Sequence, residues 1–177
     1  MVNKQPSTAK IISSFSHAEE KASPGYYSVL LKDFNIKAEL TCSNYCGFHR
    51  YTFPEAKDAM IRFDLGFAIN WDAANECFFK RINDSTFAGY RYSTGWAKDQ
   101  RVFFAVRTSK PVKSKVFFEG INRTARDSVK NKNVVACLLF DTKANEAIEM
   151  KVALSFANIQ GALKALEQTQ NIHFNDA

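Results

Sequence analysis

The chain has 177 residues, of which 46% are hydrophobic and 14% aromatic, including 16 Phe. This composition can build one sizeable core, so it excludes an intrinsically disordered chain and favours a single domain. The formal net charge is +6, and no apolar run approaches the roughly 18–20 residues of a membrane-spanning helix.

The first half of the chain predicts β structure. Residues 1–14 are rich in Ser and poor in hydrophobic residues, so we expect a disordered lead-in there. Short apolar runs then alternate with turn signals such as Pro24-Gly25 and Asn83-Asp84-Ser85. Strands are predicted over Tyr26–Leu31, Ile36–Thr41, Gly47–Phe53, Met60–Leu65, Cys77–Ile82 and Phe87–Tyr92, and the second and third of these alternate with a period of two.

The second half continues with strands and ends in a helix. Strands are predicted over Arg101–Thr108, Lys115–Phe118, Val134–Phe140 and Ala147–Phe156, the third of them buried on both faces. Ile121–Asn133 is polar and basic, which predicts a surface loop. After Asn158, a plausible N-cap, the period changes: apolar residues lie at i, i+3, i+4 and i+7, which predicts a helix over Asn158–Gln168.

The sequence carries few catalytic signals. It has no HExxH, GxSxG, P-loop or GxGxxG motif and no acidic loop typical of calcium sites. Cys42 and Cys46 lack the second pair or the His cluster of a zinc site, so the four Cys are interpreted as small buried hydrophobes. A disulfide depends on the redox compartment and stays open.

The first two candidate sites each have a structural alternative. His17 precedes Glu20 and the Pro24-Gly25 turn, so it either lies on an ordered loop at a cleft rim or caps a structural turn. In His49-Arg50-Tyr51, period two places Arg50 on the opposite face from its two neighbours. Arg50 then either binds a functional carboxylate or forms a cross-strand charge pair, and we favour the pair.

The third candidate is a short stretch that contains Arg91, Ser93 and Trp96. An aromatic ring offers an apolar face to sugar C–H groups, and Arg and Ser offer polar contacts, so this composition is typical of a sugar platform. The alternative is that Trp96 anchors the core or a domain interface. A basic segment, 101–133, has nine Lys or Arg against two acidic residues; it is either a solvated loop or a patch for anionic polymers.

Three ordered segments carry a family resemblance: FSHAEEKASPGYYSVLL from Phe15, GFHRYTFP from Gly47 and GYRYSTGWAKDQRVFF from Gly89. Together with the closing LLFDTKANEAIEMKVALSFANIQGALKALEQ, they are similar to the amino-terminal β-sandwich domain of the family 92 glycoside hydrolases. That family comprises calcium-dependent, inverting α-mannosidases of the α-1,2-mannosidase type. The glycine-rich entry motifs of its first third have no counterpart before Phe15.

The resemblance implies an all-β fold, an antiparallel β-supersandwich of the galactose-mutarotase type, incomplete at its N-terminus and followed by one C-terminal helix. It implies a lead-in over 1–14, a partial sandwich over 15–157 and a linker helix over 158–177, leading to an (α/α)6 catalytic domain absent from this sequence. Calcium and the catalytic residues belong to that second domain, so we assign no catalytic, metal or cofactor residue here.

The expected function follows from this assignment. The chain is interpreted as a non-catalytic domain or fragment of an α-1,2-mannosidase that binds mannose-containing glycans and shapes the cleft. Its rival is a free-standing carbohydrate-binding or interaction module. His17, Arg91, Ser93 and Trp96 are the expected substrate-binding or interface residues. We also expect no nucleic acid, no membrane span, and self-association through exposed edges; the family suggests a periplasmic or extracellular protein, although no signal peptide is visible.

Overall fold

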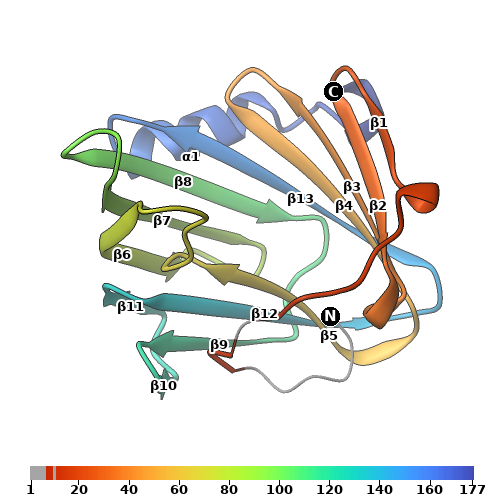
Figure 1. Ribbon diagram of the computed structural model, residues 1–177, viewed down its shortest axis with the longest axis horizontal. Coiled ribbons are helices and arrows are strands. Elements are labelled where there is room, and N and C mark those ends of the chain that lie inside the picture. Colours follow the sequence, from red (N-terminus) through yellow and green to blue (C-terminus); the bar gives the residue numbers. More distant parts are fainter. Residues whose placement is uncertain (1–6, 10) are drawn as a thin grey trace.

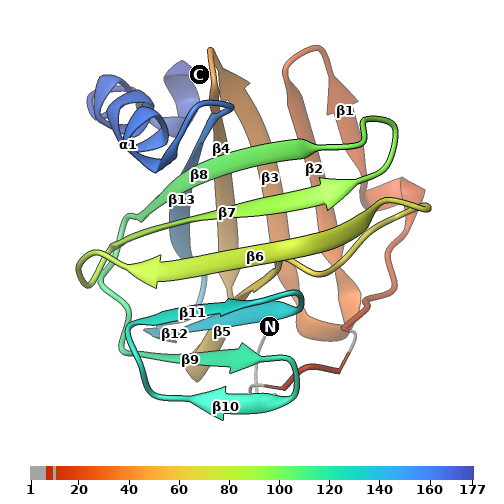
Figure 2. The same ribbon diagram turned by 90° about the vertical axis from the view of Figure 1, so that its left-hand side faces the viewer.

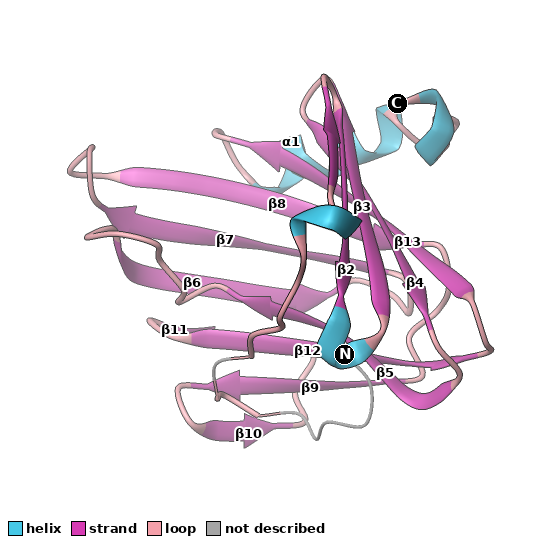
Figure 3. Cartoon of the chain, turned by 45° about the vertical axis from the view of Figure 1, so that its right-hand side comes forward, coloured by secondary structure: helices cyan, strands magenta, loops and turns pink. Residues whose placement is uncertain are grey.

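A computed structural model describes residues 7–9 and 11–177. Strands make up most of the described chain, and Figure 3 shows one longer helix beside them. The strands are β1 Lys21–Ser23, β2 Tyr26–Leu31, β3 Ile36–Ser43, β4 Cys46–Phe53, β5 Ala56–Asp64, β6 Ala73–Arg81, β7 Thr86–Thr94, β8 Gln100–Thr108, β9 Ser114–Glu119, β10 Asn122–Thr124, β11 Ser128–Asn131, β12 Val134–Thr142 and β13 Glu146–Ser155. The helices are α1 Ile159–Gln168 and the short 3-10 turns η1 His17–Glu19, η2 Lys32–Phe34 and η3 Phe174–Asp176.

The strands form two antiparallel sheets. The larger has the order β1-β2-β3-β4-β13-β8-β7-β6-β11, and the smaller has the order β10-β9-β12-β5. Figure 1 shows the large sheet bending, so that β1 to β4 rise on one side while β8, β7 and β6 run across the other, above the small sheet. The prediction of an all-β, antiparallel sandwich with one C-terminal helix is confirmed.

The core between the sheets is built largely of Phe. Phe79, on β6, is fully buried, and its ring lies 5.3 Å from those of Phe63 and Phe117 on the small sheet. Phe87 and Phe104, on the neighbouring strands β7 and β8, each lie 5.8 Å from the same ring. Phe79 therefore joins the inner faces of both sheets, where flat aromatic side chains pack well on the pleated surface.

Helix α1 packs on the outer face of the large sheet. Ala88, Ala105 and Ala153 lie opposite one another on β7, β8 and β13 and are completely buried. Their small side chains make a shallow row on which Ala162 and Leu166 of α1 pack, and Figure 2 shows the helix beside β8 and β13. The N-cap prediction is confirmed, because the Asn158 side chain accepts a hydrogen bond from the Gly161 N–H at 2.8 Å.

The segment after α1 returns to the sheet and is held there by side chains of β3, β4 and β13. The Lys151 ammonium donates hydrogen bonds to the backbone carbonyls of Thr169 and Gln170, so these carbonyls just after the helix have a hydrogen-bond partner. The Arg50 guanidinium lies 4.1 Å above the Phe174 ring, and the Thr41 hydroxyl donates to the Ala177 carbonyl. The direction of the chain at residue 177 is therefore set by contacts with the sheet.

The structure corrects one of the predicted elements. Residues 121–133 were expected to be a surface loop, yet they contain β10 and β11, and β11 pairs with β6 at the edge of the large sheet. An edge strand needs one inward side chain, and here Val129 is buried while its polar neighbours face solvent. The lead-in expected over 1–14 lies partly outside the described residues; positions 7–9 and 11–14 contain no helix or strand.

The remaining strand predictions agree with the structure to within a few residues, and every side chain of Val134–Phe140 is buried, as predicted for a strand covered on both faces. Cys46, Cys77 and Cys137 are buried small side chains, whereas Cys42 is exposed, and all four are free thiols. Burial raises the pKa of the Cys77 and Cys137 thiols to about 11, so both are unreactive at neutral pH.

Candidate functional site

An open pocket lies where β6 begins, β7 ends and β8 begins. Its volume is about 440 Å³, within the range of ~300–1,000 Å³ that is usual for small-molecule sites. Antiparallel pairing of β6 with β7 and of β7 with β8 brings these strand ends together with the loop that follows β5. The lining residues are Phe67, Ala68, Ile69, Asn70, Trp71, Asp72, Arg91, Trp96 and Gln100.

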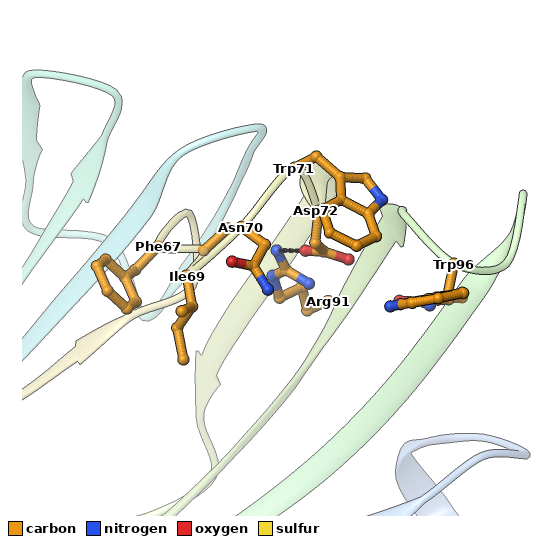
Figure 4. A pocket seen from close by; sticks show the side chains of 9 residues that line it. Phe67, Ile69, Asn70, Trp71, Asp72, Arg91 and Trp96 are labelled. Atoms are coloured by element: carbon orange, nitrogen blue, oxygen red, sulfur yellow. Dashed lines mark hydrogen bonds and ion pairs between the residues drawn. The ribbon is translucent and has the colours of Figure 1, made fainter.

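The pocket is dominated by two Trp side chains that are unusually accessible. The side chains of Trp71 and Trp96 belong to residues that are 62% and 88% exposed, and their ring centroids are 5.5 Å apart with planes inclined at 55°. Figure 4 shows Trp96 to one side of Arg91 and Trp71 above Arg91. Large apolar residues with this exposure, gathered in a hollow, indicate a contact surface.

A polar network lies beside the two rings. The Arg91 guanidinium pairs with the Asp72 carboxylate (Figure 4), and its Nε–H donates to the Leu65 carbonyl at 2.9 Å. This ion pair, rather than the smaller contribution of the Ser93 hydroxyl, is the main reason that the pKa of Asp72 lies below its usual value. Ser93 is buried, and its hydroxyl donates to the Gln100 side chain at 3.2 Å.

Gly95 has a steric reason to be glycine. A Cβ atom at this position would lie 3.0 Å from an Asp72 carboxylate oxygen and 3.3 Å from the Asp72 Cβ. A side chain at position 95 would therefore require Asp72 to shift by a few tenths of an ångström. Trp96, the next residue, lines the pocket.

The structure brings three of the four candidate residues together. Arg91, Ser93 and Trp96 meet at this pocket, and Trp96 is too exposed to be a core residue. The sequence reading missed Trp71 and Asp72, which come from the loop before β6. The available signal was the other Trp of the chain, Trp71, adjacent to an Asp in a segment with no strand pattern.

His17 lies elsewhere. It belongs to η1 beside β1 and β2, on the opposite half of the large sheet from β6 and β7 (Figure 1). Its Nδ1 is 2.5 Å from the Glu20 carboxylate, which also accepts a 2.6 Å hydrogen bond from the Tyr27 hydroxyl. The Tyr27 bond, followed by the His17 bond, lowers the pKa of Glu20. Ser16, and not His17, accepts the backbone N–H at the start of this turn.

Arg50 forms the predicted cross-strand pair. It lies opposite Glu149 on β13, and its Nε–H donates to the Glu149 carboxylate at 2.9 Å. On the other face of β4, His49 and Tyr51 are hydrogen-bonded at 2.9 Å, and burial raises the pKa of Tyr51 to about 12 and lowers that of His49. These contacts give both faces of β4 a structural role.

The basic segment is largely neutralised by neighbouring carboxylates. Lys115 pairs with Asp127 at 3.0 Å, Arg126 with Glu119 at 2.6 Å and Lys130 with Glu76 at 2.8 Å. Arg101, Lys110 and Lys113 of the same segment also pair with carboxylates that lie outside it. Because most of these cations already have a partner, the solvated surface is the better interpretation of the segment.

Neither a cluster of three or more metal-binding side chains nor a helix able to span a membrane is found in the part of the chain that the structure describes. Among residues 7–9 and 11–177, no three His, Cys, Asp or Glu side chains gather closely enough to hold a metal ion. Within the same described residues, no helix is long and apolar enough to cross a membrane. The described side chains therefore do not fit a calcium site.

Acid should disturb the pocket only at low pH. Arg91 lowers the pKa of Asp72, so its charged form stabilises the fold fully above the unfolded pKa, about 3.9, and this contribution is lost as pH falls through the lower folded pKa. We expect a carboxyl ¹³C NMR titration of Asp72 to have its midpoint below that value. Asp72→Asn should remove the signal, and a midpoint above about 4.5 would contradict the ion pair.

Comparisons with known proteins identify relatives of the whole described fold. The sequence model of the glycosyl hydrolase family 92 N-terminal domain matches residues 1–155. Two structures of the family GH92 alpha-mannosidase BT3965 from Bacteroides thetaiotaomicron, one in complex with mannoimidazole, superpose with a TM-score of 0.88 at 34% identity. They cover 93% of this chain, which spans only 23% and 22% of theirs.

More distant structures share the fold. The inverting mannosidase BT2199 from Bacteroides thetaiotaomicron superposes with a TM-score of 0.77 at 22% identity, over 91% of this chain and 21% of its own. The GH92 family glycosyl hydrolase ccman5 superposes with a TM-score of 0.82 at 21% identity, over 92% of this chain and 23% of its own. No curated protein matches the sequence.

Proposed function

Because this chain belongs to the glycosyl hydrolase family 92 N-terminal domain family, we propose that it is the non-catalytic N-terminal domain of an α-1,2-mannosidase that degrades mannose-containing glycans. The observation that carries the proposal is the family match over residues 1–155. The 34% identity to the alpha-mannosidase BT3965 supports it, although this chain spans less than a quarter of that protein.

The chemistry of the pocket supports a role in binding rather than in catalysis. Inverting glycosidases use two carboxyl groups about 6.5–9.5 Å apart, one as acid and one as base. Among the described lining residues, Asp72 is the one carboxylate, and it is paired with Arg91. The pair of catalytic carboxylates would then come from an (α/α)6 catalytic domain, which would also hold the calcium ion.

In this proposal the domain shapes one wall of the glycan cleft. Residues 15–157 form the sandwich, and residues 158–177 lead toward the catalytic domain. The contacts of Arg50, Lys151 and Thr41 with the C-terminal segment support a fixed exit direction, which a cleft shared by two domains requires. Exposed sheet edges and a periplasmic or extracellular location, both expected from the sequence and the family, stay predictions, as does self-association.

A free-standing carbohydrate-binding module is the second candidate. It is favoured by one observation: the pocket is already open and lined by exposed Trp side chains on this chain alone. The two candidates differ in what the chain does when a catalytic domain is supplied. Only the first predicts that the two parts form one active enzyme.

The purified chain should release no mannose from α-1,2-mannobiose, with or without calcium. Adding a separately produced catalytic domain of the family should yield a stable complex and calcium-dependent release of mannose, measured by a coupled mannose assay. The catalytic domain alone is the matched control and should be much less active. Mannose release by this chain alone, abolished by a chelator, would refute the non-catalytic assignment; failure to associate with the catalytic domain would favour the free-standing module.

A further inference from the structure

We propose that the Trp71–Trp96 pocket is a subsite for one neutral hexose unit. Its ring stacks on the Trp96 indole, and one of its hydroxyls donates a hydrogen bond to the Asp72 carboxylate. The inference rests on the proposed function and specifies the ligand of the same site. It assigns stacking to Trp96, hydrogen-bond acceptance to Asp72 and positioning of Asp72 to Arg91.

Trp96 presents a free aromatic face. A sugar ring stacks through its C–H groups on an open aromatic face, and Trp96 is 88% exposed at the pocket mouth. The aromatic column on the outer face of the large sheet lacks this property. There Tyr90 stacks between Phe78 at 5.3 Å and Tyr92 at 4.3 Å, and the Arg101 guanidinium lies 5.2 Å from the Tyr92 ring.

The two indoles are inclined to each other. Planes inclined at 55° form a corner, whereas a flat polysaccharide surface needs platforms that lie in one plane. A corner encloses one ring and contacts it from two sides. The pocket volume of about 440 Å³ is sufficient for a ligand of this size.

The charges in the pocket are balanced. The Arg91 guanidinium neutralises the Asp72 carboxylate, so the pocket has no excess positive charge with which to select a uronic acid or a phosphorylated sugar. The carboxylate oxygens retain acceptor capacity beyond the Arg91 bond, and Asn70 and Gln100 add amide groups. Hydroxyls of a neutral sugar match this set of donors and acceptors.

A protein surface is a weaker match for the same residues. Covering the pocket with an apolar protein surface would take the Asp72–Arg91 pair out of water without supplying partners for its remaining lone pairs and N–H groups, which is costly. A hexose covers the indoles and supplies those hydrogen bonds at the same time. We therefore favour the sugar over a protein partner, and the experiment below separates them.

The chain contains its own reporter. Its sequence has two Trp, and both line the pocket, so intrinsic Trp fluorescence reports on this site alone. Titration of the full chain with methyl α-D-mannopyranoside should change Trp emission with a dissociation constant on the order of 1 mM, as expected for a ligand of this size. Glucuronic acid, the anionic comparator, should bind no better.

Matched variants separate the contributions. Trp96→Ala should weaken methyl mannoside binding at least about tenfold, with Trp71 as the remaining reporter, while Trp96→Phe should retain most of it. Asp72→Asn should weaken binding about tenfold through loss of a charged acceptor. The controls are Phe156→Ala, also highly exposed, and Asp99→Asn, which also breaks a surface pair with an Arg; both should leave binding unchanged.

Three outcomes would overturn the inference. The first is that methyl mannoside leaves Trp emission unchanged at 50-fold the expected dissociation constant, on the order of 50 mM. The second is much tighter binding of glucuronic acid. The third is that Trp emission shifts only when the catalytic domain is added, which would identify the pocket as a protein interface. None of these would remove the proposed mannosidase function, which depends on complex formation and mannose release.

Discussion

Replacing Phe79 with Ala should lower the free energy of unfolding by about 3–5 kcal/mol, the cost of emptying a large aromatic site in a packed core. Phe79 is fully buried on β6 and contacts rings of both sheets, including Phe63 and Phe117 of the small sheet. The cavity would therefore open at the junction of the two sheets, where neighbouring rings anchored on separate strands can collapse only partly into it.

The measurement is urea unfolding followed by circular dichroism. Phe78→Ala is the matched control, since Phe78 is the same residue type one position earlier on β6, but points to the half-exposed outer face. Phe78→Ala should lower the free energy of unfolding by less than half as much as Phe79→Ala does. Equal losses for the two variants would show that the inter-sheet core does not dominate stability.

Gly89→Ala should be the second severe substitution, lowering the free energy of unfolding by about 3 kcal/mol, the upper end for overpacking. Gly89 is on β7, and a Cβ at this position would clash with the backbone carbonyl of Phe78 and lie 2.7 Å from the Phe104 ring. The carbonyl belongs to the paired strand β6, so relief requires movement of the strands rather than of a side chain. Because Arg91 and Ser93 follow on the same strand, Trp emission from the pocket should also change.

Gly47→Ala provides the control within the same sheet. Gly47 is on β4, and its nearest neighbour for an added Cβ is the His49 ring at 3.5 Å, an ordinary van der Waals contact. Since Gly inside a strand costs about 0.5–1 kcal/mol relative to Ala, this variant should be as stable as the original chain or slightly more stable. A comparable decrease in the free energy of unfolding for Gly47→Ala and Gly89→Ala would contradict the steric explanation for Gly89.

The site was only partly predictable from the sequence. Arg91, Ser93 and Trp96 lie within six residues, so their composition alone indicated a platform. Asp72 and Trp71 lie 19 or more residues earlier, in a loop without periodicity, and their contacts with Arg91 and Trp96 arise only when β6 pairs with β7. His17 was grouped with Arg91 and Trp96, yet the order of strands places it at the far end of the sheet.

Local sequence patterns were sufficient to predict most strands, the doubly buried Val134–Phe140 and the helix that begins after Asn158, because the faces of a strand or helix are set by neighbours in the chain. The order of the strands and the partners that are distant in the sequence required the tertiary structure. Arg50 meets Glu149 only because β4 lies beside β13, and β11 forms only because β6 offers it an edge. Local periodicity specifies which side chains share a face. Which faces and strand edges then meet depends on the packing of the whole chain, which no short segment contains.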